Sequence, residues 1–337
     1  MLPEELAACF DALGLPSYRA GQVFQWISRG AASFEEMTNL PKELRTRLGE
    51  RFELPSLRAE RKQISSEDGT VKLLWRLPDG ESVETVLMRY KHGNTVCISS
   101  QVGCRMGCAF CASTLGGRIR DLRASEMLDE VIRTGIETES EITNIVLMGI
   151  GEPLDNFDNV VRFLRLVNRP EGQNIGMRHI SLSTCGLAEG IDKLAALNLQ
   201  LTLSVSLHAP DNETRSRLMP VNRTWDVDAL FDACERYFRK TGRRISFEYA
   251  MIRDVNDTDR HAHLLLKRLR GTGAHVNLIR LNYVPERGLQ PSPEERVRRF
   301  AAILTEGGVT ATVRRRLGSD IDAACGQLRR GSMKRDV

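Results

Sequence analysis

The 337-residue chain has little that would place it in a membrane or outside the cell. No apolar run approaches the roughly 20 residues that a membrane-spanning helix needs. The first residues, MLPEELAACFDALGL, include two Glu and one Asp, and they lack the basic start and apolar middle of a secretory signal. We therefore expect a cytoplasmic location and no membrane partner.

A strong charge of one sign is also missing. The chain has 48 Lys and Arg against 44 Asp and Glu, and a net charge of +4 neither requires nor excludes nucleic acid. Two basic clusters are either solvated faces or phosphate contacts. They consist of Arg236, Arg239, Lys240, Arg243 and Arg244, and of Arg314, Arg315, Arg316, Arg329, Arg330, Lys334 and Arg335.

Internal repeats and low-complexity segments are absent, so the hydrophobic pattern has to define the domains. Val23, Phe24 and Ile27 recur at helical spacing before Gly30, which predicts a small helical domain over residues 1–58. Residues 59–90 are strand-like around Pro78-Asp79-Gly80, a turn sequence that predicts a β-hairpin. We expect the main domain over 91–318 and a C-terminal segment over 319–337.

Within the main domain, strand-like and helical runs alternate, which predicts right-handed βαβ units and a parallel sheet. About six units are too few for a closed eight-unit barrel. The predicted fold is therefore α/β, a partial (β/α)6 barrel resembling an incomplete TIM barrel, with its chemistry at the C-terminal strand ends. The expected strands are 95–99, 144–148, 179–184, 201–206, 245–251 and 276–281, and the helices are 126–137, 156–168, 190–197, 227–240 and 260–270.

Three of the eight cysteines, Cys104, Cys108 and Cys111, form a Cys-x3-Cys-x2-Cys loop after the first barrel strand. In a chain without a secretory signal this favours metal or redox chemistry in a reducing compartment over disulfides. Thiolates are the ligands of iron–sulfur clusters, and three of them leave a fourth iron open. The alternative is a structural zinc site. Such a site normally has four ligands, and the residues near the loop that could add to the three cysteines are His92 and Cys97.

The cysteine spacing, with Phe110 before the last cysteine, resembles the signature of the radical S-adenosylmethionine (SAM) superfamily. The resemblance implies one 4Fe-4S cluster held by the three cysteines. It also implies that the amino and carboxylate groups of SAM chelate the open iron, and that one electron cleaves SAM to methionine and a 5′-deoxyadenosyl radical.

Residues at successive strand ends are candidates for the SAM site. Glycine permits close backbone approach, and Glu152 can receive an ammonium group. Each polar residue could instead be a helix cap or a turn residue. The candidates are Gly149, Gly151 and Glu152 in "MGIGEPLDN", Ser183 in "ISLSTCG", Ser206, Leu207 and His208 in "LSVSLHAP", and Asn282 in "LNYVP".

Nearly the whole chain resembles the RlmN and Cfr methyltransferases, which modify an adenine of 23S ribosomal RNA. The motifs occur in the family order: "AGQVFQWI", "SFEEMTNLPKELR", "VETVLM", the cluster, "GEPLDN", "LSTCG", "SVSLHAP" and "GSDIDAACGQL". The N-terminal domain and the last motif are closer to the RlmN branch. This implies methylation of carbon 2 of adenine-2503 in the peptidyl-transferase centre, and of adenine-37 in certain transfer RNAs.

The resemblance also implies a mechanism with two SAM molecules per turnover. Cys325 accepts a methyl group from the first, and the radical derived from the second abstracts hydrogen from S-methyl-Cys325. The methylene radical joins the adenine, Glu84 accepts the ring proton, and Cys97 attacks Cys325 to release the RNA and form a disulfide. Implied partners are an electron donor such as flavodoxin or ferredoxin, and a disulfide reductant.

Three alternatives stay open at this point. The chain could methylate carbon 8, as Cfr does, it could be a zinc-stabilised RNA-binding protein without catalysis, or it could be a radical SAM enzyme with another substrate. The sequence also departs from many relatives, which have Arg-Asn-Leu where this chain has Arg120, Asp121 and Leu122. If the asparagine contacts SAM or RNA, that contact is altered here.

Overall fold

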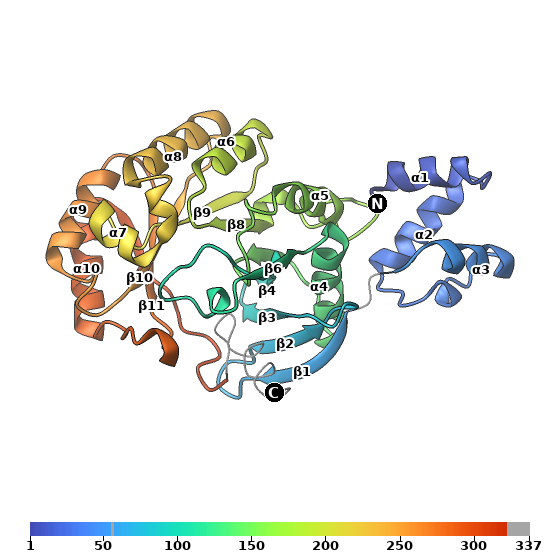
Figure 1. Cartoon of the computed structure of the whole chain (residues 1–337), viewed down its shortest axis with the longest axis horizontal. Helices are drawn as coiled ribbons and strands as arrows, with labels where there is room; N and C mark the ends of the chain where they lie inside the picture. Colours follow the sequence, from blue (N-terminus) through green and yellow to red (C-terminus); the bar gives the residue numbers. More distant parts are fainter. Residues whose placement is uncertain (55–56, 322–337) are drawn as a thin grey trace.

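A computed structural model of the chain describes residues 1–54 and 57–321, so Cys325 lies outside the described residues. Three helices form a lobe at the N-terminus, beside a larger α/β part (Figure 1). They are α1 (Pro3–Ala12), α2 (Tyr18–Ser28) and α3 (Lys42–Arg51), with Phe10, Val23, Phe24 and Leu48 buried between them. The helical character predicted for this region is therefore confirmed.

The N-terminal lobe packs against α4 (Ala124–Glu137). Gly30 has a positive φ of 85°, and a Cβ added there would lie 2.4 Å from the Cδ1 atom of Ile136. Directly after the lobe, the backbone N–H of Leu57 donates to the buried Asp129 carboxylate at 2.8 Å. The close approach at Gly30 and the hydrogen bond at Leu57 together fix the lobe to the outer helical layer.

The large part contains one ten-stranded sheet in the order β1-β2-β3-β4-β7-β8-β9-β10-β11-β12. From β4 onward all pairs are parallel, whereas β1 to β4 pair antiparallel. The strands are β1 (Arg58–Ile64), β2 (Val71–Arg76), β3 (Ser82–Tyr90), β4 (Gly93–Cys97), β7 (Asn144–Leu147), β8 (Ile180–Thr184), β9 (Thr202–Ser206), β10 (Ser246–Met251), β11 (His275–Arg280) and β12 (Thr310–Val313).

The six predicted barrel strands are all present, so the partial (β/α)6 barrel is confirmed. β12, which is parallel to β11 and follows α10 (Glu294–Glu306), was not predicted. The hairpin turn at Pro78–Gly80 joins β2 and β3 as expected. However, β1 adds a third antiparallel strand, and β3 pairs with β4, so this segment extends the barrel sheet.

A second, two-stranded sheet lies between β4 and the cysteine loop. It pairs β5 (Gln101–Gly103) with β6 (Arg118–Asp121), so the loop follows β5 directly and not the first barrel strand. At the base of the loop Gly103 has φ of 77°, and a Cβ there would lie 1.9 Å from the carbonyl oxygen of Gly117. Glycine is therefore required at this position.

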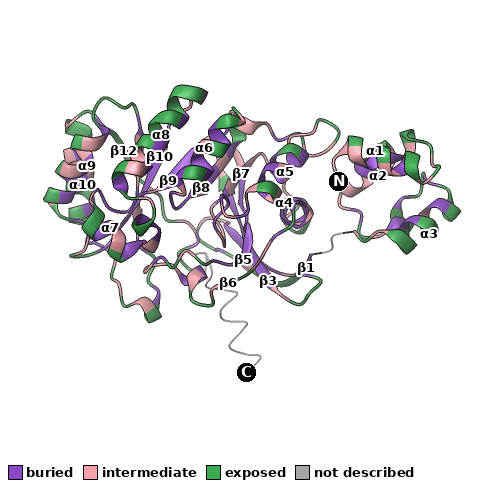
Figure 2. Cartoon of the chain, turned by 45° about the horizontal axis from the view of Figure 1, so that its top comes forward, coloured by how far each residue is buried: buried purple, intermediate pink, exposed green. Residues whose placement is uncertain are grey.

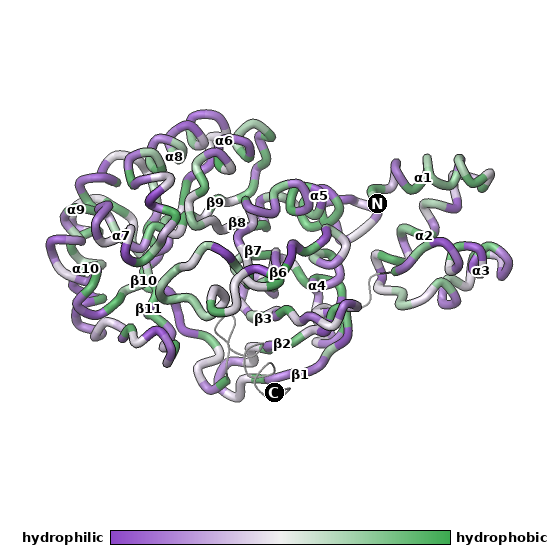
Figure 3. Tube along the Cα trace, viewed as in Figure 1, coloured by the Kyte–Doolittle hydropathy of each residue, from purple (hydrophilic) through white to green (hydrophobic). Residues whose placement is uncertain are grey.

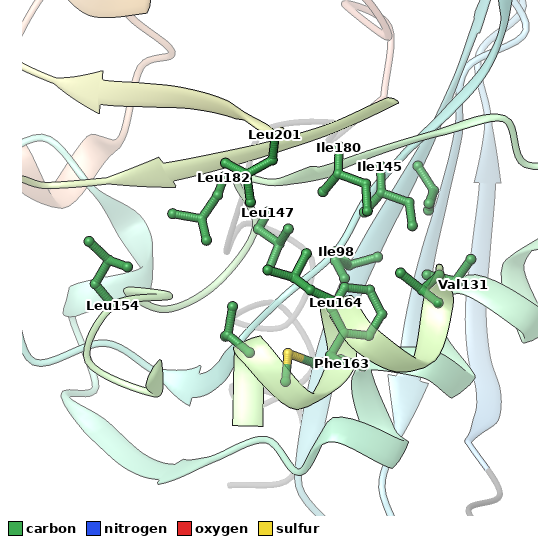
Figure 4. Close-up of a cluster of buried hydrophobic side chains, with 14 of the residues drawn as sticks. Ile98, Val131, Ile145, Leu147, Leu154, Phe163, Leu164, Ile180, Leu182 and Leu201 are labelled. Carbon is green, nitrogen blue, oxygen red and sulfur yellow. The ribbon is translucent and has the colours of Figure 1, made fainter. Parts of the chain in front are cut away.

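Helices cover the outer face of the parallel strands, with buried residues toward the sheet and exposed residues outward (Figure 2). Hydrophilic and hydrophobic residues alternate along these helices (Figure 3). The predicted stripe of α5, Val160, Phe163, Leu164 and Val167, is buried. Phe163 and Leu164 lie against Ile145, Leu147 and other strand residues in the core (Figure 4). The helices are α5 (Phe157–Val167), α6 (Ala188–Ala196), α7 (Asn212–Leu218), α8 (Val227–Thr241) and α9 (Asp259–Leu269), besides α4 and α10.

The segment after β12 connects the two ends of the open sheet. Gly318 N–H donates to Asp68 at 2.9 Å, and Ser66 N–H donates to Asp320 at 2.8 Å, both across to the turn between β1 and β2. We call residues 314–321 the strap. None of the helices in the described part of the chain is long and apolar enough to span a membrane.

Glu130 on α4 should give the stability of the fold a pH dependence. Its carboxylate is fully buried and accepts a hydrogen bond from Ser99 N–H at 3.0 Å, and burial raises its pKa well above the usual value. A carboxyl group with a raised pKa binds more protons in the folded than in the unfolded chain. Its contribution to stability therefore falls as pH rises from the unfolded pKa toward the folded pKa.

Glu130→Gln keeps an acceptor for Ser99 and removes this titration. The melting temperature of the variant minus that of wild type should therefore increase from pH 5 to pH 8. Both are measured on anaerobically reconstituted protein. The exposed Glu137→Gln on the same helix is the control and should show no such trend. If the melting temperature of Glu130→Gln differed from that of wild type by the same amount at pH 5 and pH 8, the raised pKa of Glu130 would be contradicted.

Candidate active site

A cavity of about 280 Å³ opens at the C-terminal ends of the parallel strands. It brings together nearly all of the predicted cluster and SAM residues. Leu207 is the exception, because its side chain is fully buried in the core. The predicted residues that line the cavity are Cys104, Cys108, Cys111, Gly149, Gly151, Glu152, Ser183, Ser206, His208 and Asn282.

Two arginines hold the cysteine loop in place from opposite sides. Arg105, inside the loop, makes a two-point ion pair with Asp155 after β7, with N–O distances of 3.0 and 2.5 Å. Arg287, after β11, donates to the carbonyl oxygen of Cys111 at 3.2 Å and to Thr114 at 2.5 Å. The loop is therefore connected to distant strand ends, and its shape does not depend on local contacts alone.

The electrostatics of the cysteines suit a cationic cluster. Burial raises the pKa of Cys104 to about 12, and burial and the neighbouring thiols raise the pKa of Cys108. Thiolates at these positions need nearby positive charge, which iron ions supply. Among residues 1–54 and 57–321, no three His, Cys, Asp or Glu side chains converge on a single metal-ion position. Three thiols lining one cavity fit a cluster in which each thiolate binds a separate iron.

Glu152 connects the loop after β7 to the loop after β8. Its two carboxylate oxygens accept backbone N–H bonds from Leu154 at 3.0 Å and from Cys185 at 2.7 Å. Burial raises its pKa, and its carboxyl group lies close enough to Cys104 to raise that thiol's pKa as well. The side chains of Thr184 and Cys185 also hydrogen-bond to this carboxylate, so an ammonium group beside the cluster loop would share the Glu152 oxygens with them.

His208 is held as a neutral acceptor at the end of β9. Its Nδ1 accepts the backbone N–H of Ala250 at 2.9 Å, and burial lowers its pKa to about 3. The proton is therefore on Nε2. Its ring also packs edge-on against Phe110 of the cysteine loop, with 4.7 Å between ring centroids. The aromatic residue of the motif thus joins the cluster loop to the SAM-site candidates.

Arg215 is a supporting residue that the sequence did not reveal. Its side chain is fully buried, and it donates to the carbonyl oxygens of Cys185, Ser206 and Leu207 at 2.7 to 3.3 Å. It also donates to Asn222 at 2.9 Å. One guanidinium group therefore fixes the loops after β8 and β9. An isolated arginine in "DNETRSRL" carries no pattern that would predict this.

Two other residues have contacts that the sequence did not predict. Cys185, for which the sequence suggests simple packing, lines the cavity beside Glu152. Asp121, which departs from the family pattern, accepts hydrogen bonds from Gln101 and Arg118, each at 2.8 Å. Gln101 in turn accepts the backbone N–H of Glu152 at 2.9 Å. Asp121 thus belongs to the network behind the Gly151–Glu152 turn.

A second cavity of about 260 Å³ adjoins the first and contains Cys97. Both cavities are lined by Met148, Ile279, Asn282 and Arg314, so they are neighbouring spaces. The strap forms one wall of the second cavity up to Ile321. Cys97 is thus separated from the cluster cysteines but lies next to their cavity.

Glu84 occupies the same face of the sheet as Cys97. Cys97 pairs with Val86, and Glu84 lies two residues before Val86, so the two side chains project to one side. The Glu84 carboxylate pairs with Lys72 Nζ at 3.0 Å, and the two side chains are 3% and 0% exposed. The structure therefore puts the predicted proton acceptor on the same face of the sheet as Cys97, but in a buried ion pair and outside the lining of both cavities.

Two family models and a solved structure that match this chain identify its superfamily. Residues 98–266 match the family model of the radical SAM superfamily, and residues 1–54 match that of the ribosomal RNA large subunit methyltransferase N-terminal domain. The crystal structure of a radical SAM methyltransferase from Sphaerobacter thermophilus superposes with a TM-score of 0.92 and 45% identity, covering 97% of each chain. The fold and the cysteine loop thus define a radical SAM protein.

Curated relatives show to which family within the radical SAM superfamily the chain belongs. A protein of Alkaliphilus metalliredigens is 51% identical over 327 residues, which are 97% of this chain and 93% of that protein. A protein of Thermoanaerobacter sp. is 47% identical over 336 residues, 99% of this chain and 98% of that protein. Each is named a probable dual-specificity RNA methyltransferase RlmN. The chain belongs to the RlmN family. This membership implies a 4Fe-4S cluster and SAM, and it rules out the non-catalytic zinc alternative.

The Lys72–Glu84 pair gives a stability prediction. Removing one partner of a buried ion pair leaves an uncompensated charge and costs about 3–5 kcal/mol, whereas replacing both partners is far less costly. Lys72→Met should therefore lower the free energy of unfolding strongly, and Lys72→Met with Glu84→Leu should recover most of the loss. Additive losses in the double variant, measured by thermal unfolding, would contradict the pairing.

Arg215 gives a prediction that concerns the site. Arg215→Leu leaves several buried carbonyl oxygens without donors, at about 1–3 kcal/mol each. We expect a marked fall in melting temperature and weaker SAM binding to the reconstituted protein, measured by equilibrium dialysis. The exposed, ion-paired Arg236→Leu is the control. Unchanged SAM affinity in Arg215→Leu would show that the two loops keep their shape without it.

Proposed function

We propose that the chain methylates carbon 2 of adenine-2503 in 23S ribosomal RNA and of adenine-37 in certain transfer RNAs, through an S-methylcysteine and a transient protein–RNA adduct. The observation that carries this proposal is the pair of adjoining cavities. One holds the cluster cysteines and the SAM candidates, and the other holds Cys97 and the strap that leads to Cys325. Relatives named dual-specificity RNA methyltransferases support the RNA substrates.

In the first cavity, Cys104, Cys108 and Cys111 would hold the cluster, and the strand-end residues would hold SAM. When bound, these groups supply the electron and the radical that activate an otherwise inert methyl carbon. Glu152 would receive the ammonium group of SAM, and Ser183, Ser206 and Asn282 offer hydrogen bonds. Neutral His208 contributes an N–H donor. Leu207 supports the site from behind, because its backbone N–H donates to the carbonyl oxygen of Glu248 and its own carbonyl oxygen accepts from Arg215.

The reach of the chain supports a pairing of Cys97 with Cys325. Ile321 lines the cavity that contains Cys97, and Cys325 follows four residues later. Four residues span at most about 14 Å, a length that allows a cysteine at position 325 to enter the same cavity. Asp320, bound to Ser66, anchors the chain just before this point.

The cysteines and Glu84 then have distinct roles. The Cys325 thiolate takes a methyl group from one SAM as the carbon–sulfur bond of the donor breaks. After the methylene carbon has joined the adenine, the radical adduct has to lose one electron, for which the oxidised cluster would be the acceptor, and Glu84 takes the ring proton. The Cys97 thiolate attacks the sulfur of Cys325, so a disulfide forms as the carbon–sulfur bond to the RNA breaks, and the released methylene carbon takes a proton to become the methyl group. An external reductant must restore both thiols, and an electron donor must reduce the cluster.

Substitution of the two cysteines tests this sequence. Cys325→Ala should abolish methyl transfer, because no sulfur can accept the methyl group. Cys97→Ala should accumulate a covalent protein–RNA adduct, visible as a band of reduced mobility on a denaturing gel. Cys9→Ala in the N-terminal lobe is the control and should behave as wild type. Normal RNA methylation by Cys325→Ala would indicate a radical SAM reaction without the methylcysteine step.

The position of the methyl group tests the substrate assignment separately. Mass-spectrometric mapping of ribosomal RNA treated with the enzyme should find 2-methyladenine. Finding 8-methyladenine would instead place the chain with Cfr in activity. Mapping of transfer RNA in the same reactions tests the second substrate class.

A further inference from the structure

The second cavity has a lining that the cysteine chemistry alone does not explain. Besides Cys97, it is lined by arginines and by an aromatic residue, and no carboxylate lines it in the described part of the chain. The basic residues are Arg280 and the strap residues Arg314, Arg315 and Arg316. Disulfide formation between two cysteines does not require four arginines in the lining of a cavity.

The four arginines differ in whether their charge is already compensated. Arg280 pairs with Glu294 at 2.7 Å. Burial raises the pKa of the nearby Glu248 carboxyl group, and the positive charge of Arg314 opposes this shift. By contrast, Arg315 and Arg316 are exposed and have no ion pair with any carboxylate in residues 1–54 and 57–321. These two guanidinium groups are available to an anionic ligand.

The other basic cluster of the sequence provides the contrast. There, Arg236 binds Asp192 through two hydrogen bonds, at 2.9 and 2.8 Å, and Arg239 pairs with Glu235 at 2.5 Å. Two of its five basic residues are therefore paired with carboxylates, and Arg243 instead donates to the carbonyl oxygen of Leu201 and to Thr202. The two clusters therefore differ in where they lie. Arg236 and Arg239 are on the exposed face of α8 and pair with carboxylates, which fits a solvated helix face, whereas Arg315 and Arg316 line a cavity, which fits a phosphate site.

The acidic residues near the strap do not neutralise it. Asp68 and Asp320 bind donors of the strap and of the β1–β2 turn, namely Gly318 N–H and Ser66. Ser319 donates to Glu67. These contacts hold the strap across the cavity and leave the two guanidinium groups at its rim. Tyr283, 48% exposed, lines the same cavity and offers a ring for stacking.

We infer that this cavity receives the target nucleotide, with Arg315 and Arg316 bound to the phosphates on either side of it and Tyr283 stacked on a base. Arginine forks match phosphate geometry, and unpaired bases of folded RNA stack on aromatic side chains. Enzymes that modify a base inside folded nucleic acid take that base out of its stack. The strap would thus hold the RNA backbone while the base reaches Cys97. The inference rests on the proposed RNA methyltransferase function.

The test uses the full-length reconstituted enzyme and a synthetic hairpin RNA that carries the target adenine of 23S RNA. Replacing both Arg315 and Arg316 by Ala should weaken binding about tenfold for each arginine. It should also reduce the slope of log Kd against log salt concentration by about one for each lost phosphate contact. Arg239→Ala with Lys240→Ala removes the same charge elsewhere and should leave both quantities near wild type.

Further measurements separate a local effect from misfolding. SAM affinity and SAM cleavage without RNA should be unchanged in the strap variant, because its side chains do not hold the cluster loop. Tyr283→Phe should keep activity on the hairpin, whereas Tyr283→Ala should lower kcat/KM at least severalfold. Loss of both SAM binding and RNA binding in the strap variant would mean misfolding, and this outcome would overturn the specific role of Arg315 and Arg316.

The outcomes also distinguish the inference from the proposed function. If wild type methylates the hairpin and the strap variant binds it with unchanged affinity and salt slope, the phosphate site is wrong and the methyltransferase assignment stands. If wild type cleaves SAM but methylates neither ribosomal nor transfer RNA, the proposed function fails first. If the strap variant and the control variant lost the same RNA affinity, only the overall charge of the protein would matter, and this result would also overturn the inference.

Discussion

Backbone pairing of β4 with its two neighbours determines where the chemistry of this chain can take place. On one side the antiparallel register with β3 puts Cys97 opposite Val86 and Glu84 on the same face. On the other side the parallel register with β7 aligns Cys97 with Val146, so that the Gly149–Glu152 turn follows at the same rim. A shift of one residue would turn Cys97 away from this face. One strand therefore sets the relation between the two cavities.

Long-range polar contacts then turn this rim into a defined site. Arg215 fixes the loops after β8 and β9, and Asp155 with Arg287 fixes the cysteine loop. The strap connects the ends of an otherwise open sheet through Asp68 and Asp320. Positioning of this kind is needed for radical chemistry, because a reactive carbon must meet its target and not the surrounding protein. The rigidity of the site comes mainly from side chains that do not line the first cavity.

Much of this could be predicted from the sequence because the signals are local. The cysteine spacing, the alternating strands and helices and the strand-end motifs each depend on residues close together in the chain. The roles of Arg215 and Lys72 could not be predicted, because their partners are distant or carry no pattern. β12 was missed although its residues are mostly β-branched, because Thr310–Val313 is only four residues long. β3 and β4 pair as a hairpin around Lys91 and His92, and this pairing was missed because Lys-His is not one of the usual two-residue turn sequences.

The central claim concerns the carbon of the methyl group that RNA receives. This carbon is first attached to the sulfur of Cys325, and it loses one hydrogen atom before it joins the adenine. SAM carrying a trideuterated methyl group tests it directly, with mass spectrometry of both products. The account predicts an RNA methyl group with two deuterium atoms and 5′-deoxyadenosine with one. An RNA methyl group that retains all three deuterium atoms would mean direct transfer from SAM and would contradict the account.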